Sequence, residues 1–316
     1  MATPRTMQQA PAKPEADKER RNGILLSAAA YAIWGAFPLY FKALEPPPLE
    51  VLAHRVVWSA VFLALVVLAQ RRVGSLYAAV RSGKVALWSF LSATLLGINW
   101  FIYIWAVAQG RVVDGSLGYF ITPLVSVAMG VLLFGEALRL GQWLAVATAA
   151  LGVLWLTVQF GELPWVSLGL AASFGSYAAL RKRSALDATG GLILEQLLML
   201  PFALAYLAVL AVAGTGSFGR AGASQTLLAI LAGPLTSLPL LAFAAGARRI
   251  PLSLVGVLQY ISPTFQLLLG VLLWQEAFGG KKLVGYAFIW LALLVYSLEG
   301  AWTSRLRRRA ELAQPG

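Results

Sequence analysis

The chain contains two similar apolar segments, GYFITPLVSVAMGVLLFGEAL (residues 118–138) and LQYISPTFQLLLGVLLWQEAF (residues 258–278), which align without a gap. Eight of the 21 aligned positions are identical. Unrelated apolar helices share leucine and valine by chance, but a common register of proline, glycine and glutamate indicates a duplicated unit. The pairs that carry this argument are Pro123 with Pro263, Gly130 with Gly270, and Glu136 with Glu276.

Both segments belong to a series of apolar runs, most of them close to the roughly 20 residues that a helix needs to cross a bilayer. Of the 316 residues, 59% are hydrophobic and 12% are charged; soluble domains have about 45–50% and about 25%. Helices are the expected spanning form, because lipid offers the backbone no hydrogen-bond partners. We therefore predict an all-α polytopic membrane protein with ten transmembrane helices, near residues 23–43, 50–70, 85–107, 113–134, 140–160, 164–181, 190–213, 224–246, 251–274 and 281–301.

The duplication predicts an inverted-topology repeat of five plus five helices. The second segment lies five spans after the first, and an odd number of spans reverses the orientation. We assign residues 23–160 to the first repeat and 164–301 to the second, with a disordered cytoplasmic tail at 1–22 and a basic cytoplasmic tail at 302–316. Such repeats are typical of secondary transporters. A duplicated bundle without transport activity is the alternative.

The basic residues support this topology. With a cytoplasmic N-terminus, 19 Lys and Arg residues fall on cytoplasmic segments and five on outer segments. Because positive charge concentrates on the cytoplasmic side, both termini are predicted to be cytoplasmic, in the inner or plasma membrane of a cell. The formal net charge of +12 then reflects contact with membrane lipid and does not indicate nucleic-acid binding.

Several kinds of chemistry are excluded by motifs that the sequence lacks. The chain has no Cys, which excludes disulfides and thiolate metal sites, and its single histidine, His54, excludes an HExxH zinc site. It has neither a P-loop motif nor a GxSxG nucleophile elbow. We predict no catalytic residue, no metal site and no cofactor.

Further motifs resemble those of a known family. They are AAYAIWGAFPLYFK (29–42), EVLAHRVVWS (50–59), GINWFIYIWAV (97–107), GSLGYFITPLV (115–125), FGEALRLGQWLAV (134–146) and LQYISPT (258–264). On these motifs the chain resembles the EamA family of the drug/metabolite transporter superfamily, and within it the RarD-type subgroup. The resemblance covers roughly residues 23–303 and implies a ten-helix bundle with a pocket between its halves. Gln275, which replaces the glycine before Glu276, departs from the pattern.

A polar cluster opens the second span. Glu50 and His54 are four residues apart and share a helix face, so a contact between them is expected. Arg55 lies more than a turn inside; an unpaired charge costs about 2.5–3.5 kcal/mol or more at a helix centre, so it needs a partner or water. His54 is a candidate proton relay because histidine titrates near neutral pH. The alternative is a cluster at interface depth that fixes the helix position.

Glu195 is the counterpart of this cluster in the second half. It lies at the cytoplasmic entry of the seventh span, where its carboxyl either carries a proton or pairs with Arg55 or with basic loop residues. Proton coupling through Glu195 or through the cluster is therefore one hypothesis. Glu136 and Glu276 follow the fourth and ninth spans, and we expect each to cap the next helix in the chain, since carboxylates are stabilised at helix N-termini.

Polar and aromatic residues within the spans are candidates for a substrate pocket. A buried Trp or Tyr prefers a partner for its polar tip, and such residues suit flat amphiphilic ligands. Pro123 and Pro263 are hinge candidates, because proline frees an upstream carbonyl. Helix packing and static kinks are the alternatives. The pocket candidates are Trp34, Asn99, Tyr103, Tyr119, Gln259 and Tyr260.

Together these features predict a secondary transporter that exports a small organic metabolite or drug-like amphiphile by alternating access. Since no P-loop motif for ATP is present, an ion gradient or the solute gradient itself would drive it. The alternatives are a non-transporting sensor or scaffold, a channel, and an integral-membrane enzyme. A prenyltransferase would need paired Asp-rich motifs, whereas the body of the chain contains only Asp114 and Asp187.

Overall fold

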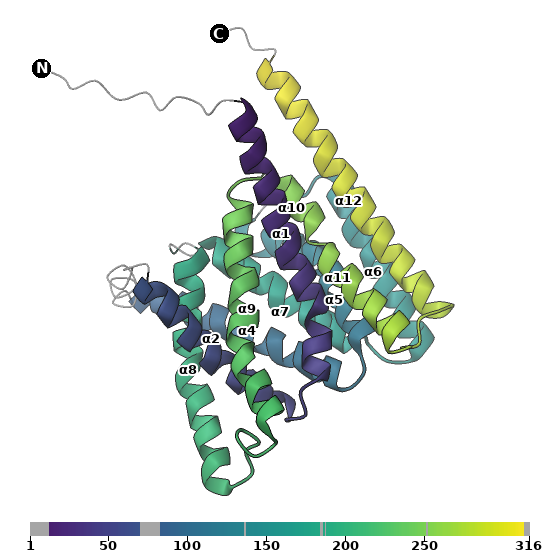
Figure 1. Ribbon diagram of the computed structural model, residues 1–316. Helices are drawn as coiled ribbons and strands as arrows, with labels where there is room; N and C mark the ends of the chain where they lie inside the picture. The colour runs from purple at the N-terminus through teal and green to yellow at the C-terminus, as the bar shows by residue number, and fades with distance from the viewer. Residues whose placement is uncertain are drawn as a thin grey trace, which may run out of the picture.

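The computed structural model describes residues 13–69, 83–135, 137–183, 186, 188–250 and 252–312. Within these ranges the chain is helical with short connections, and it forms no strand. The helices are α1 (Lys13–Lys42), α2 (Pro48–Ala69), α4 (Gly83–Ala108), α5 (Val112–Phe134), α6 (Leu140–Phe160), α7 (Trp165–Arg183), α8 (Ala188–Ala213), α9 (Ala223–Ala247), α10 (Leu252–Leu258), α11 (Ile261–Leu268), the π-helix η1 (Leu269–Leu273) and α12 (Lys281–Leu312). Figure 1 shows that the first turns of α1 and the last turns of α12 project from the same side of the bundle.

Eight helices in the described ranges are long and apolar enough to cross a membrane, which confirms the predicted all-helical membrane fold. These eight coincide with eight of the ten expected spans: α1, α2, α4, α5, α6, α8, α9 and α12. The sixth expected span corresponds to α7, whose 19 residues end in a basic run. The ninth corresponds to a broken helix over residues 252–273.

Helix α1 starts well before the first apolar run. It begins at Lys13, so the segment 13–22, which its polar composition predicts to be disordered, is helical. This segment is rich in Lys, Arg and Glu, which are good helix formers, and it extends a helix that the apolar run already provides. Glu19 in this extension pairs with Arg249 after α9, at 2.7 Å between Oε2 and Nε. Residues 1–12 of the expected tail lie outside the described ranges.

The repeated segment folds differently in its two copies. In the first copy, α5 continues through Pro123. In the second copy the chain turns at Gln259 and Tyr260 between α10 and α11, so the expectation of one continuous helix over 251–274 is wrong. Pro263 then falls in the first turn of α11, where a missing backbone N–H removes no intrahelical hydrogen bond.

Two glycines allow helices to approach closely beside the candidate site. A Cβ on Gly118 of α5 would lie 2.8 Å from the carbonyl oxygen of Ser167 on α7. A Cβ on Gly233 of α9 would lie 2.5 Å from the carbonyl carbon of Trp58 on α2. Both distances are shorter than real Cβ contacts, so a larger residue at either position would push the helices apart. These contacts hold α5 against α7 and α2 against α9.

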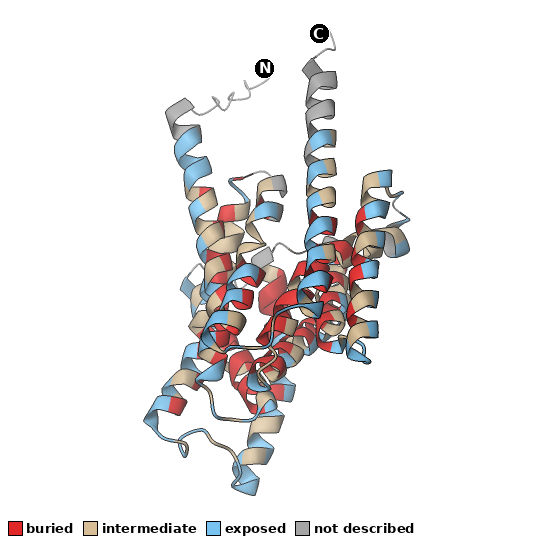
Figure 2. Cartoon of the chain, turned by 90° about the vertical axis from the view of Figure 1, so that its right-hand side faces the viewer, coloured by how far each residue is buried: buried red, intermediate tan, exposed pale blue. Residues whose placement is uncertain are grey.

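The distribution of burial agrees with a membrane environment. Buried residues lie mainly in the interior of the bundle and exposed residues mainly on its outer faces (Figure 2). Many exposed side chains are large and apolar, among them Leu132, Leu140 and Val212. Soluble monomers rarely expose continuous apolar surface of this kind. We assign the outer faces to contact with lipid.

Candidate functional site

Arg55 lies on α2 with 4% of its surface exposed. Its Nε donates a hydrogen bond to Oγ1 of Thr236 on α9 at 2.9 Å. Its guanidinium carbon lies 3.8 Å from the ring centroid of Trp100 on α4, and 5.5 and 5.6 Å from those of Phe37 and Phe41 on α1. We call these five residues the Arg55 cluster. It encloses a cation among aromatic rings, whose faces attract positive charge.

The positive charge of Arg55 has no carboxylate partner in the part of the chain that the structure describes. Glu50 lies on the same helix, but its Oε1 accepts hydrogen bonds from the backbone N of Ser217 at 2.8 Å and from its Oγ at 2.6 Å. A guanidinium has five N–H donors. Only the Nε donor of Arg55 is hydrogen-bonded within the described ranges, so both Nη groups are available to a ligand.

Three predicted pocket residues come together beside this cluster. Asn99 on α4 donates from Nδ2 to Oγ of Ser173 on α7 at 3.0 Å and to the carbonyl of Leu170 at 3.1 Å. Its Oδ1 accepts a hydrogen bond from the hydroxyl of Tyr119 at 3.3 Å. The ring centroids of Tyr119 and Tyr103 are 5.5 Å apart. Asn99, Tyr103 and Tyr119 therefore form one group between α4, α5 and α7.

This group adjoins the Arg55 cluster through aromatic contacts. The ring of Tyr103 lies 5.9 Å from that of Phe41, which also faces Arg55. The hydroxyl of Tyr103 is buried and has no hydrogen-bond partner among the described residues. A second unsatisfied polar group therefore lies near the unsatisfied donors of Arg55.

Trp34 lies at the edge of the site, on the side of α9 and α11. Its ring packs against Tyr31 and Phe243, with centroids 5.4 and 5.8 Å away. Its carbonyl accepts a hydrogen bond from Nε2 of Gln266 on α11 at 3.3 Å. The side-chain oxygen of Gln266 is buried without a partner in the described ranges.

Gln259 and Tyr260 lie elsewhere, at the turn between α10 and α11. The ring of Tyr260 stacks on Phe120 of α5, with centroids 6.3 Å apart, in a hydrophobic core that includes Tyr286. No recorded contact joins either residue to the Arg55 cluster in the described part of the chain. Their place in the chain made them candidates, but the turn directs Tyr260 to a different core.

Glu50 and His54 form the predicted contact, at 3.9 Å between Oε1 and Nε2. The ring of His54 stacks on Phe218, with centroids 4.9 Å apart. Phe218 and Ser217, which binds Glu50, both belong to the connection between α8 and α9. This pair therefore attaches that connection to the start of α2.

Glu195 on α8 is fully buried and does not pair with Arg55. Its Oε1 accepts a hydrogen bond from Oγ of Ser92 at 2.6 Å, and its Oε2 accepts one from the hydroxyl of Tyr177 at 3.2 Å. Nη1 of Arg181 on α7 lies 3.7 Å from Oε1. The carboxylate is therefore satisfied by neighbours, whereas the guanidinium of Arg55 is not.

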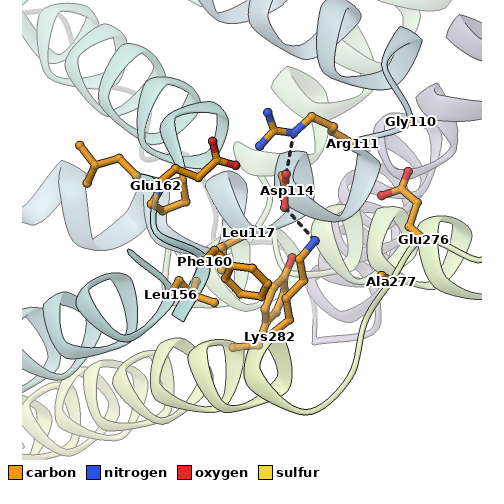
Figure 3. A pocket seen from close by; sticks show the side chains of 13 residues that line it. Gly110, Arg111, Asp114, Leu117, Leu156, Phe160, Glu162, Glu276, Ala277 and Lys282 are labelled. Carbon is orange, nitrogen blue, oxygen red and sulfur yellow. Dashed lines mark hydrogen bonds and ion pairs between the residues drawn. The ribbon is translucent and has the colours of Figure 1, made fainter. Parts of the chain in front are cut away.

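A separate pocket of about 420 Å³ opens among the helix connections (Figure 3). Arg111 and Lys282 approach Asp114 from two sides, at 2.8 and 3.4 Å from its carboxylate oxygens. Glu162 and Phe160 line the same pocket. Because its central charges already pair with each other, we place the candidate binding site at Arg55 and its neighbours.

Glu276 borders this pocket and corrects one expectation. Its Oε1 and Oε2 accept hydrogen bonds from the backbone N–H groups of Val112 and Val113, both at 2.8 Å. It therefore caps α5 in the other half of the chain, whereas we expected it to cap the next helix, α12. The first N–H groups of α5 have no partner within their own helix, and folding brings them to this carboxylate. Glu136 lies outside the described ranges.

Comparison with known proteins agrees with the fold. The EamA-like transporter family matches residues 21–158. An uncharacterized transporter of Vibrio cholerae is 44% identical over 294 residues, which cover 93% of this chain and 97% of the relative. This chain belongs to the EamA-like transporter family. Protein RarD of Escherichia coli strain K12 is 42% identical to this EamA-like chain over 289 residues, covering 91% of it and 98% of the relative.

A solved crystal structure has the same fold as this EamA-like chain. It matches with a TM-score of 0.57 at 20% identity, covering 87% of this chain and 97% of the other. The family resemblance inferred from the motifs is confirmed, and with it a multi-pass membrane protein of a transporter family.

The motifs of this EamA-like chain did not reveal four members of the Arg55 cluster. Trp100 stands out only as one of several aromatic residues in its span, and Phe37 and Phe41 resemble ordinary core residues. Thr236 has no local signal, since its role depends on the contact between α2 and α9. A buried arginine does predict aromatic or polar neighbours in general, but it does not say which helix supplies them.

Proposed function

We propose that this chain is a secondary transporter that exports a small organic metabolite or drug-like amphiphile across the inner or plasma membrane by alternating access. The observation that carries the proposal is the pairing of buried polar side chains between the two halves of the chain. Arg55 donates a hydrogen bond to Thr236, and Asn99 donates one to Ser173. Polar groups inside a membrane domain are costly and commonly mark a substrate or ion pathway.

A 5+5 inverted repeat of ten spans is part of this proposal, with α7 as the sixth span and α10, α11 and η1 together as the ninth. One pair of local arrangements supports it. In the first half, the charged Arg55 on α2 contacts Phe37 and Phe41 on α1. In the second half, three residues with the same spacing along the chain interact between α8 and α7: Glu195, Tyr177 and Arg181.

The orientation follows from charge. The start of α1 and the end of α12 lie on one side of the bundle (Figure 1), and Arg249 is held on that side by its ion pair with Glu19. The excess of basic residues on the connections of this side favours the cytoplasm. The Arg55 cluster then lies in the outer half, because Arg55 is about 10 Å along α2 from the helix start.

The driving force in this proposal is an ion gradient or the solute gradient. Glu195 is the strongest candidate for a proton carrier, because it is buried and its hydrogen-bond partners are the hydroxyls of Ser92 and Tyr177. Glu50 and His54 contact Ser217 and Phe218 in the α8–α9 connection, so they are weaker candidates for the proton carrier. These roles remain hypotheses for coupling.

A hinge and the remaining pocket residues complete the proposal. Pro123 lies inside the continuous α5 and is a better hinge candidate than Pro263, which begins a helix. Trp34 would extend the pocket toward α11. Gln259 and Tyr260 would act at the turn in the ninth span.

The test is solute counterflow in proteoliposomes that contain the full chain. Vesicles are preloaded with single members of a panel of amino acids, aromatic metabolites and antibiotics, and trace labelled solute is added outside. We expect a transient overshoot for at least one member, since only a saturable carrier exchanges solute in this way. An overshoot that is lost in Asn99→Ala but kept in Arg220→Gln, an exposed loop variant, locates the pathway in the polar interior.

Two other results would contradict a carrier. Chain that is monodisperse and helical in the vesicles, yet gives no overshoot for any member of a broad panel, contradicts a carrier for these solute classes. Flux that rises linearly with concentration and shows no counterflow would indicate a channel.

A further inference from the structure

We propose that Arg55 binds the carboxylate of a small organic anion with a flat apolar body, and that this defines the substrate class of the transporter. The inference rests on the proposed transport function and makes its binding site specific. The transport function requires only a polar pathway, whereas an anion site at Arg55 requires a positively charged subsite within that pathway.

The described residues leave Arg55 without a counter-charge. Arg55 is buried, and the described residues supply it with one hydrogen bond, to Thr236, and no carboxylate. A buried charge without a counter-charge is costly, and most buried charges are therefore paired. Charged residues inside membrane proteins commonly pair with one another or with backbone carbonyls, and Arg181 at the end of α7 lies 3.7 Å from Glu195 in this way. Arg55 lacks such a partner, so a bound anion is the simplest group that completes the site.

Glu50 and Glu276 already have other hydrogen-bond partners. Glu50 accepts two hydrogen bonds from Ser217. Glu276 caps α5 through the N–H groups of Val112 and Val113. Neither carboxylate can turn to Arg55 without leaving backbone donors unsatisfied, which costs about 1–3 kcal/mol each. Glu50 and Glu276 therefore leave the positive charge of Arg55 without a carboxylate partner.

The geometry around the guanidinium of Arg55 also suits a carboxylate. Trp100 covers the guanidinium at 3.8 Å, so a ligand approaches the Nη groups along the guanidinium edge. That edge presents parallel N–H donors that match the two oxygens of a carboxylate. The stacked ring fixes the plane of the guanidinium and so orients a bound carboxylate.

The surroundings of Arg55 suit an anion with an apolar body. Phe37 and Phe41 supply apolar ring surface beside the cation. The hydroxyl of Tyr103 is buried without a partner in the described ranges and can donate to an acceptor on the ligand. These features select a compact ligand that combines an anionic group, a flat apolar body and one further acceptor.

Arg55 is enclosed in this conformation, so ligand exchange requires movement. Its hydrogen bond to Thr236 joins the first half of the chain to the second. Separation of α2 from α9 breaks this bond and uncovers the guanidinium. Alternating access supplies a movement of this kind, since each half contributes one partner.

The first experiment measures binding by the wild-type chain in detergent, from the thermal shift of the purified protein. The probes are matched pairs that differ in charge: 3-phenylpropionate against 3-phenylpropionamide, indole-3-acetate against indole-3-acetamide, and hexanoate against hexanamide. We expect at least one carboxylate to stabilise the protein, and its neutral amide to bind about tenfold more weakly or worse. Equal binding of acid and amide, or no binding of any carboxylate at millimolar concentration, overturns the proposal.

The second experiment assigns the subsite to Arg55. We expect Arg55→Gln to lose the preference for the carboxylate, and Arg55→Lys to retain part of it, because lysine keeps the charge but not the parallel donors. Arg220→Gln, which removes a charge from an exposed loop, should bind as the wild type does. A full carboxylate preference in folded Arg55→Gln overturns the assignment, and the wild-type pairs test the proposal even if this variant does not fold.

The two proposals fail separately. Counterflow of a neutral solute, combined with no binding of carboxylates, leaves the transporter and removes the anion site. Carboxylate binding that depends on Arg55, combined with no counterflow for any bound anion, leaves the site and removes the carrier.

Discussion

Glu276→Gln should weaken the contact between the halves of the chain near the start of α12. In the native protein both carboxylate oxygens of Glu276 accept hydrogen bonds, from the N–H groups of Val112 and Val113 at 2.8 Å. A glutamine keeps one acceptor oxygen, but its NH₂ group then faces a backbone N–H that is also a donor. The substitution therefore replaces one hydrogen bond with a donor–donor contact at nearly unchanged volume.

Two effects lower the free energy of unfolding of the Glu276→Gln variant. Leaving one partly buried N–H without an acceptor costs about 1–3 kcal/mol. Removing the negative charge from the N-terminus of α5 costs about 0.3–1 kcal/mol at an exposed site and up to ~2 kcal/mol at a partly buried one. We expect the free energy of unfolding to fall by about 2–3 kcal/mol, which for a chain of this size lowers Tm by roughly 3–6 °C.

The assay combines melting with chemical labelling. Because the chain has no Cys, Leu117→Cys introduces a single reporter into the wall of the neighbouring pocket, at a position that is 2% exposed. Glu276→Gln should lower Tm and speed the reaction of this cysteine with a water-soluble maleimide, since the loosened contact admits water. The matched control is Glu162→Gln, because Glu162 lines the same pocket and makes no hydrogen bond or ion pair within the described part of the chain. Equal Tm values and equal labelling rates in the two variants would refute the reasoning.

Three further substitutions test other contacts. Gly233→Ala should destabilise the protein and reduce substrate binding, because its Cβ would overlap the backbone of α2. Gly300→Ala is the control, since its Cβ meets no atom within 4 Å, and melting curves should show a lower Tm for Gly233→Ala alone. Glu50→Ala should release the α8–α9 connection, since it removes the oxygen that accepts both hydrogen bonds from Ser217; faster tryptic cleavage there is expected, and an unchanged cleavage rate would count against it. Glu195→Gln should flatten the pH dependence of transport if this carboxyl carries the proton, so an unaltered pH profile of counterflow removes it from the mechanism.

The candidate site was predictable in part, and the successes have one physical cause. Asn99, Tyr103 and Tyr119 are polar groups in apolar spans, and such groups must find partners inside the protein. Composition therefore marks them as interior residues, and the structure places them together. The same reasoning predicted that Arg55 needs a partner or water, but it could not predict that the partners are rings and one hydroxyl.

The predictions that were wrong concern contacts between residues that are distant in the chain. Glu276 was expected to cap the next helix, because sequence shows only which helix follows, and it caps α5 instead. The two copies of the repeated segment look equivalent, yet a turn precedes Pro263 and none interrupts the helix at Pro123. Similar local sequences adopt different local structures here, and the neighbours of each segment differ.

The sequence by itself determined the class of the protein and the places of most helices. Long apolar runs can satisfy their backbone in lipid only as helices, and this constraint acts within each segment. The tertiary structure decided which side chains meet: the approach of α9 to α2 at Gly233, the hydrogen bond that Arg55 donates to Thr236, and the ring of Trp100 over the guanidinium. These contacts depend on helix packing across the whole chain, because a spacing of 181 residues between Arg55 and Thr236 carries no information about distance.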